Sequence, residues 1–147
     1  MKNLIKATVI LMIAGSSFQA IGQEKVIQVS NLPQTARNFI NKHYANEKVA
    51  LTKSEKEGLS SIEYKVILAN GIEVEFDNKG NWTEVDAKNF SVPQDIIPAN
   101  IKSYVQKSFP ENNIVQINKS KKGYEIELTN GIEVKFNKQG EFIKIDD

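Results

Sequence analysis

The strongest constraint on this chain is an internal repeat. The 17 residues from Asn70 to Asp86 align with those from Asn130 to Asp146 at an offset of 60, and 8 of the 17 positions are identical. Self-similarity at a fixed spacing is typical of a structural unit that a chain uses more than once. We therefore expect two copies of one unit.

The similarity extends upstream at an offset of 65, where Leu32-Pro33 matches Ile97-Pro98 and Phe39-Ile40 matches Tyr104-Val105. The change in offset places a five-residue insertion near residues 58–62 of the first copy. The sequence thus divides into a leader at 1–22, a first unit at 23–90 and a second unit at 91–147. A lone unit of about 60 residues buries too little surface to be very stable, so we expect the two units to join edge to edge.

One amphipathic helix is expected in each unit. Apolar residues at i, i+3, i+4 and i+8 share one face of a helix, and a proline precedes each set in the position typical of a first turn. The two sets are Ala36, Phe39, Ile40 and Tyr44, and Ile101, Tyr104, Val105 and Phe109.

Strand-like segments follow each helix. They lie near 49–53, 64–68, 72–76 and 82–86 in the first unit, and near 114–118, 124–128, 132–136 and 142–146 in the second. Together with the helices they predict an α+β fold, in which two tandem helix-plus-antiparallel-meander repeats form one extended sheet with both helices on one face.

The lengths of the turns predict which side chains share a face. A three-residue loop at 69–71 pairs Val66 with Val74 and Tyr64 with Phe76, so apolar residues meet. An even-length loop at 77–80 would then put Thr83 and Val85 on the core face. By the same parity, residues 143 and 145 would face the core, whereas Trp82 and Phe142 would point away from the helices.

The first 22 residues have the layout of a secretory signal peptide. Lys2 and Lys6 precede an apolar run at 7–14, and Ala20 and Gly22 supply the small residues expected before a cleavage site at Gln23. The run is too short to span a membrane, so we expect no stable membrane insertion after cleavage. The mature protein should be periplasmic or secreted.

Composition excludes several classes of protein. The chain has no cysteine and one histidine, His43, so it lacks the residues for disulfides, for cysteine-ligated metals and for most nucleophile–histidine pairs. No metal or cofactor is expected, and the protein is expected not to be an enzyme. Net charge is +1, and it becomes −1 once residues 1–22 are removed, which disfavours nucleic acid as a partner.

Two features remain as candidate sites. Glu73, Glu75 and Glu84 should share the open face, where they form either a solvated strand surface or a paired-carboxylate site. Trp82 and Phe142, exposed on the same face, would suit a protein-binding surface, because aromatic residues dominate interface hot spots. The alternative is that both aromatic residues only pack against neighbouring side chains.

These residues also resemble a known family. The segments 26–40, His43-Tyr44 and 70–82 look like the PepSY-like, beta-lactamase-inhibitor-like family of secreted bacterial proteins. The resemblance implies tandem helix-plus-sheet repeats similar to the beta-lactamase inhibitory protein, whose concave sheet grips an enzyme. It also implies an exported, non-catalytic and most often periplasmic protein. The second copy differs from the first in carrying Phe142 for Trp82, Lys135 for Glu75 and Lys144 for Glu84.

The sequence therefore favours a non-enzymatic module that binds a protein or peptide of unknown identity. Its predicted binding residues are Trp82, Phe142, Glu73, Glu75, Glu84, Lys135 and Lys144. Two alternatives stay open. One is a carboxylate-based hydrolase of envelope glycans that uses Glu73, Glu75 or Glu84. The other is an accessory or sensor protein that binds a small ligand in a pocket between the repeats.

Overall fold

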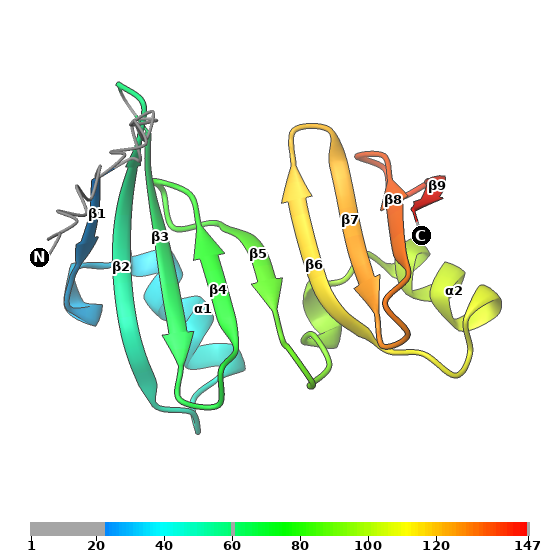
Figure 1. Ribbon diagram of the computed structural model, residues 1–147, viewed down its shortest axis with the longest axis horizontal. Coiled ribbons are helices and arrows are strands. Elements are labelled where there is room, and N and C mark those ends of the chain that lie inside the picture. The colour runs from blue at the N-terminus through cyan, green and yellow to red at the C-terminus, as the bar shows by residue number, and fades with distance from the viewer. Residues whose placement is uncertain (1–22, 60, 147) are drawn as a thin grey trace, which may run out of the picture.

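The computed structural model describes residues 23–59 and 61–146, so the predicted leader at 1–22 lies outside the described residues (Figure 1). In chain order the elements are β1 (Gln23–Val26), η1 (Val29–Asn31), α1 (Gln34–His43), β2 (Val49–Glu57), β3 (Ser61–Leu68), β4 (Glu73–Phe76), β5 (Trp82–Asp86), η2 (Gln94–Ile96), α2 (Ala99–Ser108), β6 (Ile114–Ser120), β7 (Gly123–Leu128), β8 (Glu133–Phe136) and β9 (Phe142–Asp146).

All nine strands belong to one antiparallel sheet, in which spatial order follows chain order. A helix followed by four strands occurs twice, as α1 with β2–β5 and as α2 with β6–β9. The two halves join where β5 pairs with β6. This arrangement is the α+β architecture, with one antiparallel sheet and two helices, that the sequence predicts.

Both helices pack on the same face of this sheet, and Figure 1 shows them behind the strands. In α1, Ala36 and Ile40 are buried, and the ring of Phe39 meets Phe76 edge to face at 5.6 Å between ring centroids. In α2, Tyr104 meets Phe136 in the same way at 5.4 Å. The apolar spacing read from the sequence is therefore the packing face of each helix.

The core runs without a break across the junction between the halves. Residues directly opposite one another on neighbouring strands share a face of the sheet. One such row of buried side chains comprises Val74, Val85, Ile117, Ile126 and Val134. Burying each of these side chains contributes about 1.5–3 kcal/mol, so the row holds the two halves together as one sheet.

The Asn-Gly loops have the predicted geometry. The backbone N–H of Leu68 donates to Ile72 at 2.8 Å, and Gly71 has a φ of +91°. Val66 lies opposite Val74, as expected from a three-residue loop. The second half repeats this pattern, with Leu128 donating to Ile132 at 2.9 Å.

The predicted geometry of the next loop is wrong. The N–H of Asp77 donates to the carbonyl of Asn81 at 2.9 Å, which leaves a three-residue loop at 78–80 instead of an even-length one. Trp82 consequently lies opposite Phe76. A β-bulge then places one extra residue, Thr83, in β5, because Glu75 lies opposite Glu84.

The odd-length loop and the bulge have opposite effects on which face of the sheet the side chains of β5 occupy. Val85 is buried on the core face as predicted, but Thr83 is the extra residue of the bulge and not a core position. The second half has the same irregularity between Lys135 and Phe136. There the predicted core residues Ile143 and Ile145 are 55% and 41% exposed.

Neither described helix is long and apolar enough to cross a membrane.

Candidate functional site

The face of the sheet opposite the helices carries continuous rows of charged and polar side chains; we call it the open face. Cross-strand pairing aligns one row from β2 to β9. Its members are Lys53, Lys65, Glu75, Glu84, Asn118, Glu125, Lys135 and Lys144. Because β5 pairs with β6, the row passes from one half to the other without interruption.

A neighbouring row on the open face is mostly acidic. It runs through Glu73, Asp86, Gln116, Glu127, Glu133 and Asp146. Like charges therefore lie directly opposite each other at several points, including Glu75 with Glu84 and Glu127 with Glu133. Such pairs each destabilise a sheet by about 0.2–1 kcal/mol unless a cation lies between them.

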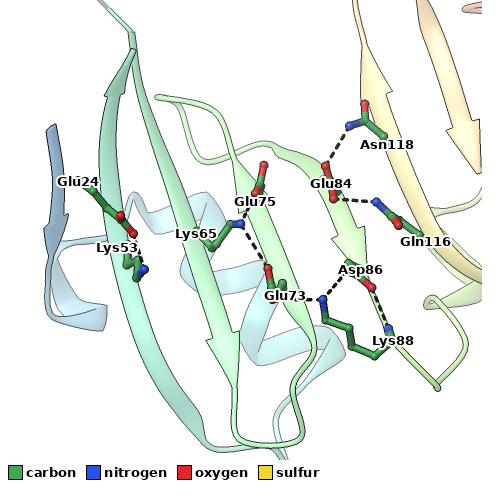
Figure 2. Close-up of polar contacts among 10 residues, drawn as sticks. All are labelled: Glu24, Lys53, Lys65, Glu73, Glu75, Glu84, Asp86, Lys88, Gln116 and Asn118. Carbon is green, nitrogen blue, oxygen red and sulfur yellow. Dashed lines mark hydrogen bonds and ion pairs between the residues drawn. The ribbon is translucent and has the colours of Figure 1, made fainter. Parts of the chain in front are cut away.

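Lysines supply that cation in the first half (Figure 2). Lys65 Nζ lies 2.7 Å from Glu75 Oε1 and 3.3 Å from Glu73 Oε2. The hydrogen bond to Glu75 is the main reason that the pKa of Lys65 is raised. Lys88 Nζ joins Glu73, at 3.2 Å, to Asp86, at 2.5 Å. Burial would raise the pKa of Glu73, but these two lysines lower it overall.

Glu84 differs from its neighbours because no lysine contacts it in the described structure. Its two carboxylate oxygens accept hydrogen bonds from Gln116 Nε2, at 2.9 Å, and Asn118 Nδ2, at 3.1 Å (Figure 2). Burial, and then repulsion from Glu75, raise the pKa of Glu84. The amide donors hold this carboxylate across the junction of the two halves.

The second half has fewer cations between its carboxylates. Lys135 Nζ lies 2.7 Å from Asp146 and 3.5 Å from Glu125, and Lys144 Nζ lies 2.6 Å from Asp146. Glu127 and Glu133 lie opposite each other and have no ion-pair partner among the described residues. Their charges remain available to a ligand.

The open face is acidic although the chain as a whole is nearly neutral. Among the strand residues whose side chains the structure describes, it carries eleven carboxylates and four lysines, and Lys88, just after β5, reaches the same face. The carboxylates are Glu24, Glu55, Glu63, Glu73, Glu75, Glu84, Asp86, Glu125, Glu127, Glu133 and Asp146, and the strand lysines are Lys53, Lys65, Lys135 and Lys144. A hollow of about 420 Å³ in the first half is lined by both kinds of residue, including Lys65, Glu73 and Glu75.

The structure divides the sequence-predicted site residues between two faces. Glu73, Glu75, Glu84, Lys135 and Lys144 lie on the open face. Lys65 and Lys88, which join Glu73 and Glu75 to Asp86, were not among the residues predicted from the sequence. The register of β3 against β4 could have indicated Lys65, because it lies opposite Glu75.

The predicted position of Trp82 on the open face is wrong. Trp82 lies opposite Phe76, whose ring contacts Phe39 of α1, so its side chain is on the helix-covered face. It packs against the core, and Lys119 Nζ lies 5.0 Å from the centre of its ring. The physical reason is the odd loop at 78–80, which reverses the facing of residue 82.

Phe142 is likewise on the helix-covered face, contrary to the prediction. Its ring stacks on Tyr104 of α2 with centroids 5.0 Å apart and planes 13° from parallel. It also meets Phe136 at 6.5 Å. Trp82 and Phe142 therefore cannot anchor a partner on the open face.

Trp82 instead lines a groove of about 500 Å³ on the helix side, where the halves meet. Phe39, Lys42 and His43 of α1 form one wall, and Lys119 and Tyr124 of the second half lie on the other side. The groove contains aromatic rings and cations from both halves. A ligand could use this groove as well as the hollow on the open face.

At one end of this groove, His43 contacts the segment that links the halves. Its Nδ1 lies 3.4 Å from Asp95 Oδ1, its side chain is 8% exposed, and its ring packs 4.4 Å from that of Phe39. Burial lowers the pKa of His43, Asp95 opposes that effect, and Lys42 reinforces it. These contacts fix α1 against η2.

Comparison with known proteins identifies the family. Residues 62–144 match the family described as "Putative beta-lactamase-inhibitor-like, PepSY-like". The chain belongs to this PepSY-like family. No curated protein matches the chain.

Solved structures of two relatives have the fold of this PepSY-like protein. A "putative periplasmic protein" of the DUF2874 family from Bacteroides vulgatus is 43% identical, with a TM-score of 0.82 over 85% of this chain and 98% of that one. A "putative calcium-regulated periplasmic protein" from Bacteroides thetaiotaomicron is 47% identical, with a TM-score of 0.81 over 84% and 97%. Like these relatives, the protein is periplasmic.

Proposed function

We propose that this PepSY-like protein is an exported, non-enzymatic binding module that recognises, through its open face, a protein or peptide carrying lysine or arginine side chains. The observation that carries the proposal is the like-charged pair formed by Glu127 and Glu133, which have no cation between them in the described structure. A ligand cation placed there would relieve their repulsion and gain charge-assisted hydrogen bonds.

The size of the open face supports a macromolecular partner. Neighbouring strands lie about 4.8 Å apart, so nine strands give a face on the order of 40 Å wide. Several rows of side chains along the strands bring its area close to the roughly 800 Å² that each partner buries in an ordinary interface. The hollow beside Lys65 and Glu75 could accommodate side chains of the partner.

We propose further that the two halves are copies of one unit and bind as one surface. The row of side chains that crosses the β5–β6 junction supports a shared binding surface, because Gln116 and Asn118 of the second half donate hydrogen bonds to Glu84 of the first. The copies are not equivalent, because Glu75 and Glu84 of the first correspond to Lys135 and Lys144 of the second. A bound segment would therefore have one preferred orientation.

The non-enzymatic part of the proposal is supported by the arrangement around Glu84. Its pKa is raised, as a catalytic acid requires, but both of its oxygens already accept hydrogen bonds from amide side chains. This arrangement suits a structural carboxylate at the junction better than a proton donor. Hydrolysis of envelope glycans by purified protein, lost in Glu84→Gln, would contradict this conclusion.

The proposal can be tested by capture from the periplasm with crosslinking. The test variant is Glu75→Gln/Glu127→Gln/Glu133→Gln, and the control is Glu47→Gln/Glu111→Gln, which neutralises exposed carboxylates in the loops after the two helices. We expect one partner to be captured by the wild type and the control, but at least tenfold less by the test variant. Equal capture by all three proteins would exclude the open face as the binding surface.

A second candidate function is binding of a small ligand in the groove beside Trp82. The groove of about 500 Å³ lies between the halves and combines aromatic rings with cations, which is the composition of many ligand sites. Trp82 is the single tryptophan of the chain, so its fluorescence reports directly on the groove. A saturable change in Trp82 emission with a periplasmic metabolite, absent in Phe39→Ala, would support this function.

A further inference from the structure

The two halves differ in how well they cover equivalent edge residues. Val85 in β5 and Ile145 in β9 occupy corresponding positions, opposite Val74 and Val134 respectively. Val85 is fully buried, whereas Ile145 is 41% exposed. Ile145 is thus an apolar residue at the position of a core residue, but its own half of the protein does not bury it.

The cover that Val85 has is a neighbouring strand. Ile117 of β6 lies opposite Val85, and the N–H of Ala87 donates to Val115 at 2.8 Å. No strand lies on the outer edge of β9 among the described residues. Phe142 and Ile143 are also about half exposed there. Exposed apolar residues beside unpaired backbone groups are typical of an edge that accepts another strand.

We propose that the outer edge of β9 pairs with β9 of a second copy of this chain, antiparallel and about a two-fold axis at Ile145. Alternate residues of a strand direct their backbone groups to the same side. The N–H of Ala87 points toward β6, so Val85, two residues earlier, directs its backbone groups to the same side. Ile145 of β9 corresponds to Val85 of β5, so Ile145 directs its N–H and C=O away from β8, toward the outer edge. In the dimer, the N–H of each Ile145 would donate to the C=O of the other copy. The neighbouring strand would then bury the Ile145 side chain, as Ile117 of β6 buries Val85.

Charge complementarity favours this register. With Ile145 on the axis, Lys144 lies opposite Asp146 of the partner subunit, and the symmetry makes two such pairs. These are non-hydrogen-bonded positions, in which opposing Cα atoms are only about 4.5 Å apart and side chains meet closely. A register shifted to place the axis at Lys144 would bring two lysines together and lose this attraction.

Charge exchange tests the pairing. Sedimentation of the mature chain should show a weak dimer, because a short strand pair buries little surface. Lys144→Asp and Asp146→Lys should each weaken dimerisation at least tenfold, since each places like charges opposite one another. The double variant Lys144→Asp/Asp146→Lys should restore it. A monomeric wild type, or a double variant as weak as the single ones, would overturn the proposal.

A unique cysteine tests the axis directly, because the chain has none of its own. Opposing residues at hydrogen-bonded positions lie about 5.5 Å apart, within the range for a disulfide. Ile145→Cys should therefore form a covalent dimer under mild oxidation, whereas Val26→Cys, exposed on the opposite edge strand β1, should stay largely monomeric. Equal crosslinking of the two variants would indicate random collision and overturn the proposal. Circular dichroism checks that each variant is folded.

Discussion

Trp82 lies directly opposite Phe76, and this pair puts the single tryptophan on the helix-covered face of the sheet. Trp82 therefore packs against the core and also lines the groove. Its fluorescence also distinguishes the two faces, because a ligand on the open face does not touch it.

We expect Trp82→Ala to lower the free energy of unfolding by about 2 kcal/mol, less than the 3–5 kcal/mol typical of a fully buried aromatic residue, because Trp82 is half-buried. Urea unfolding followed by circular dichroism measures the change. A cost below about 0.5 kcal/mol would contradict the packing seen here.

The loop at 78–80 should depend on Gly80 more than the loop at 69–71 depends on Gly71. Both glycines have positive φ, +84° and +91°, but a Cβ at Gly80 would lie 2.8 Å from the backbone N of Ala36, whereas one at Gly71 would meet nothing within 4 Å. We expect Gly71→Ala to cost about 1 kcal/mol and Gly80→Ala about 3 kcal/mol. Thermal unfolding of the two variants compares them, and equal costs would argue against close packing of this loop on α1.

Removing the hydroxyl of Tyr44 should stabilise the protein. This buried group has no hydrogen-bond partner among the described residues, and burial raises the pKa of Tyr44 to about 12. The corresponding residue of the second half is Phe109. We expect Tyr44→Phe to raise the free energy of unfolding by about 1 kcal/mol. A loss of stability in urea would show that the hydroxyl is satisfied, for example by water.

The protein should lose stability as the pH falls below 6.5, through His43. Its folded pKa lies below the ordinary value of 6.5, so the unfolded chain binds a proton that the folded protein resists. The stability contributed by neutral His43 is complete above pH 6.5 and declines as the pH falls toward the folded pKa. His43→Gln should flatten the dependence of the melting temperature on pH between 7.5 and 5.5.

Asp95→Asn is the matched control for this titration. It removes the carboxylate that raises the pKa of His43, so the loss of stability on acidification should become steeper. A shallower slope in Asp95→Asn would contradict the assignment.

Much of the fold follows from local rules. The helices could be predicted because their apolar residues recur at helical spacing, and the register of β3 with β4 because Asn70-Gly71 allows a positive φ. The geometry of the loop after Phe76 could not be predicted from these rules. The Oδ1 of Asp77 accepts hydrogen bonds from the backbone N–H groups of Lys79 and Asn81, both at 2.9 Å, and these favour an odd loop that alternation of residues does not reveal.

The candidate site could be predicted only where strand alternation alone decides which face a side chain occupies. Alternation places Glu73, Glu75 and Glu84 on one face whatever the loop length, provided that Val74 and Val85 face the core. The facing of Trp82 depends on the loop and the bulge, which only the three-dimensional pairing shows. Of the lysine bridges, the contact of Lys65 with Glu75 follows from the register of β3 against β4, but the contact of Lys88 with Glu73 depends on a long side chain that reaches back from the loop after β5.

Whether the open face binds the captured partner can be measured directly by mapping the binding site. Backbone and side-chain NMR of the mature protein, titrated with that partner, separates the open face from the groove. We predict shift changes at Lys65, Glu75, Glu127 and Glu133, which weaken as salt is added, with the indole signal of Trp82 unchanged. Changes confined to Trp82, Phe39 and Tyr124, with the open-face residues unaffected, would show that the partner binds in the groove and contradict binding by the open face.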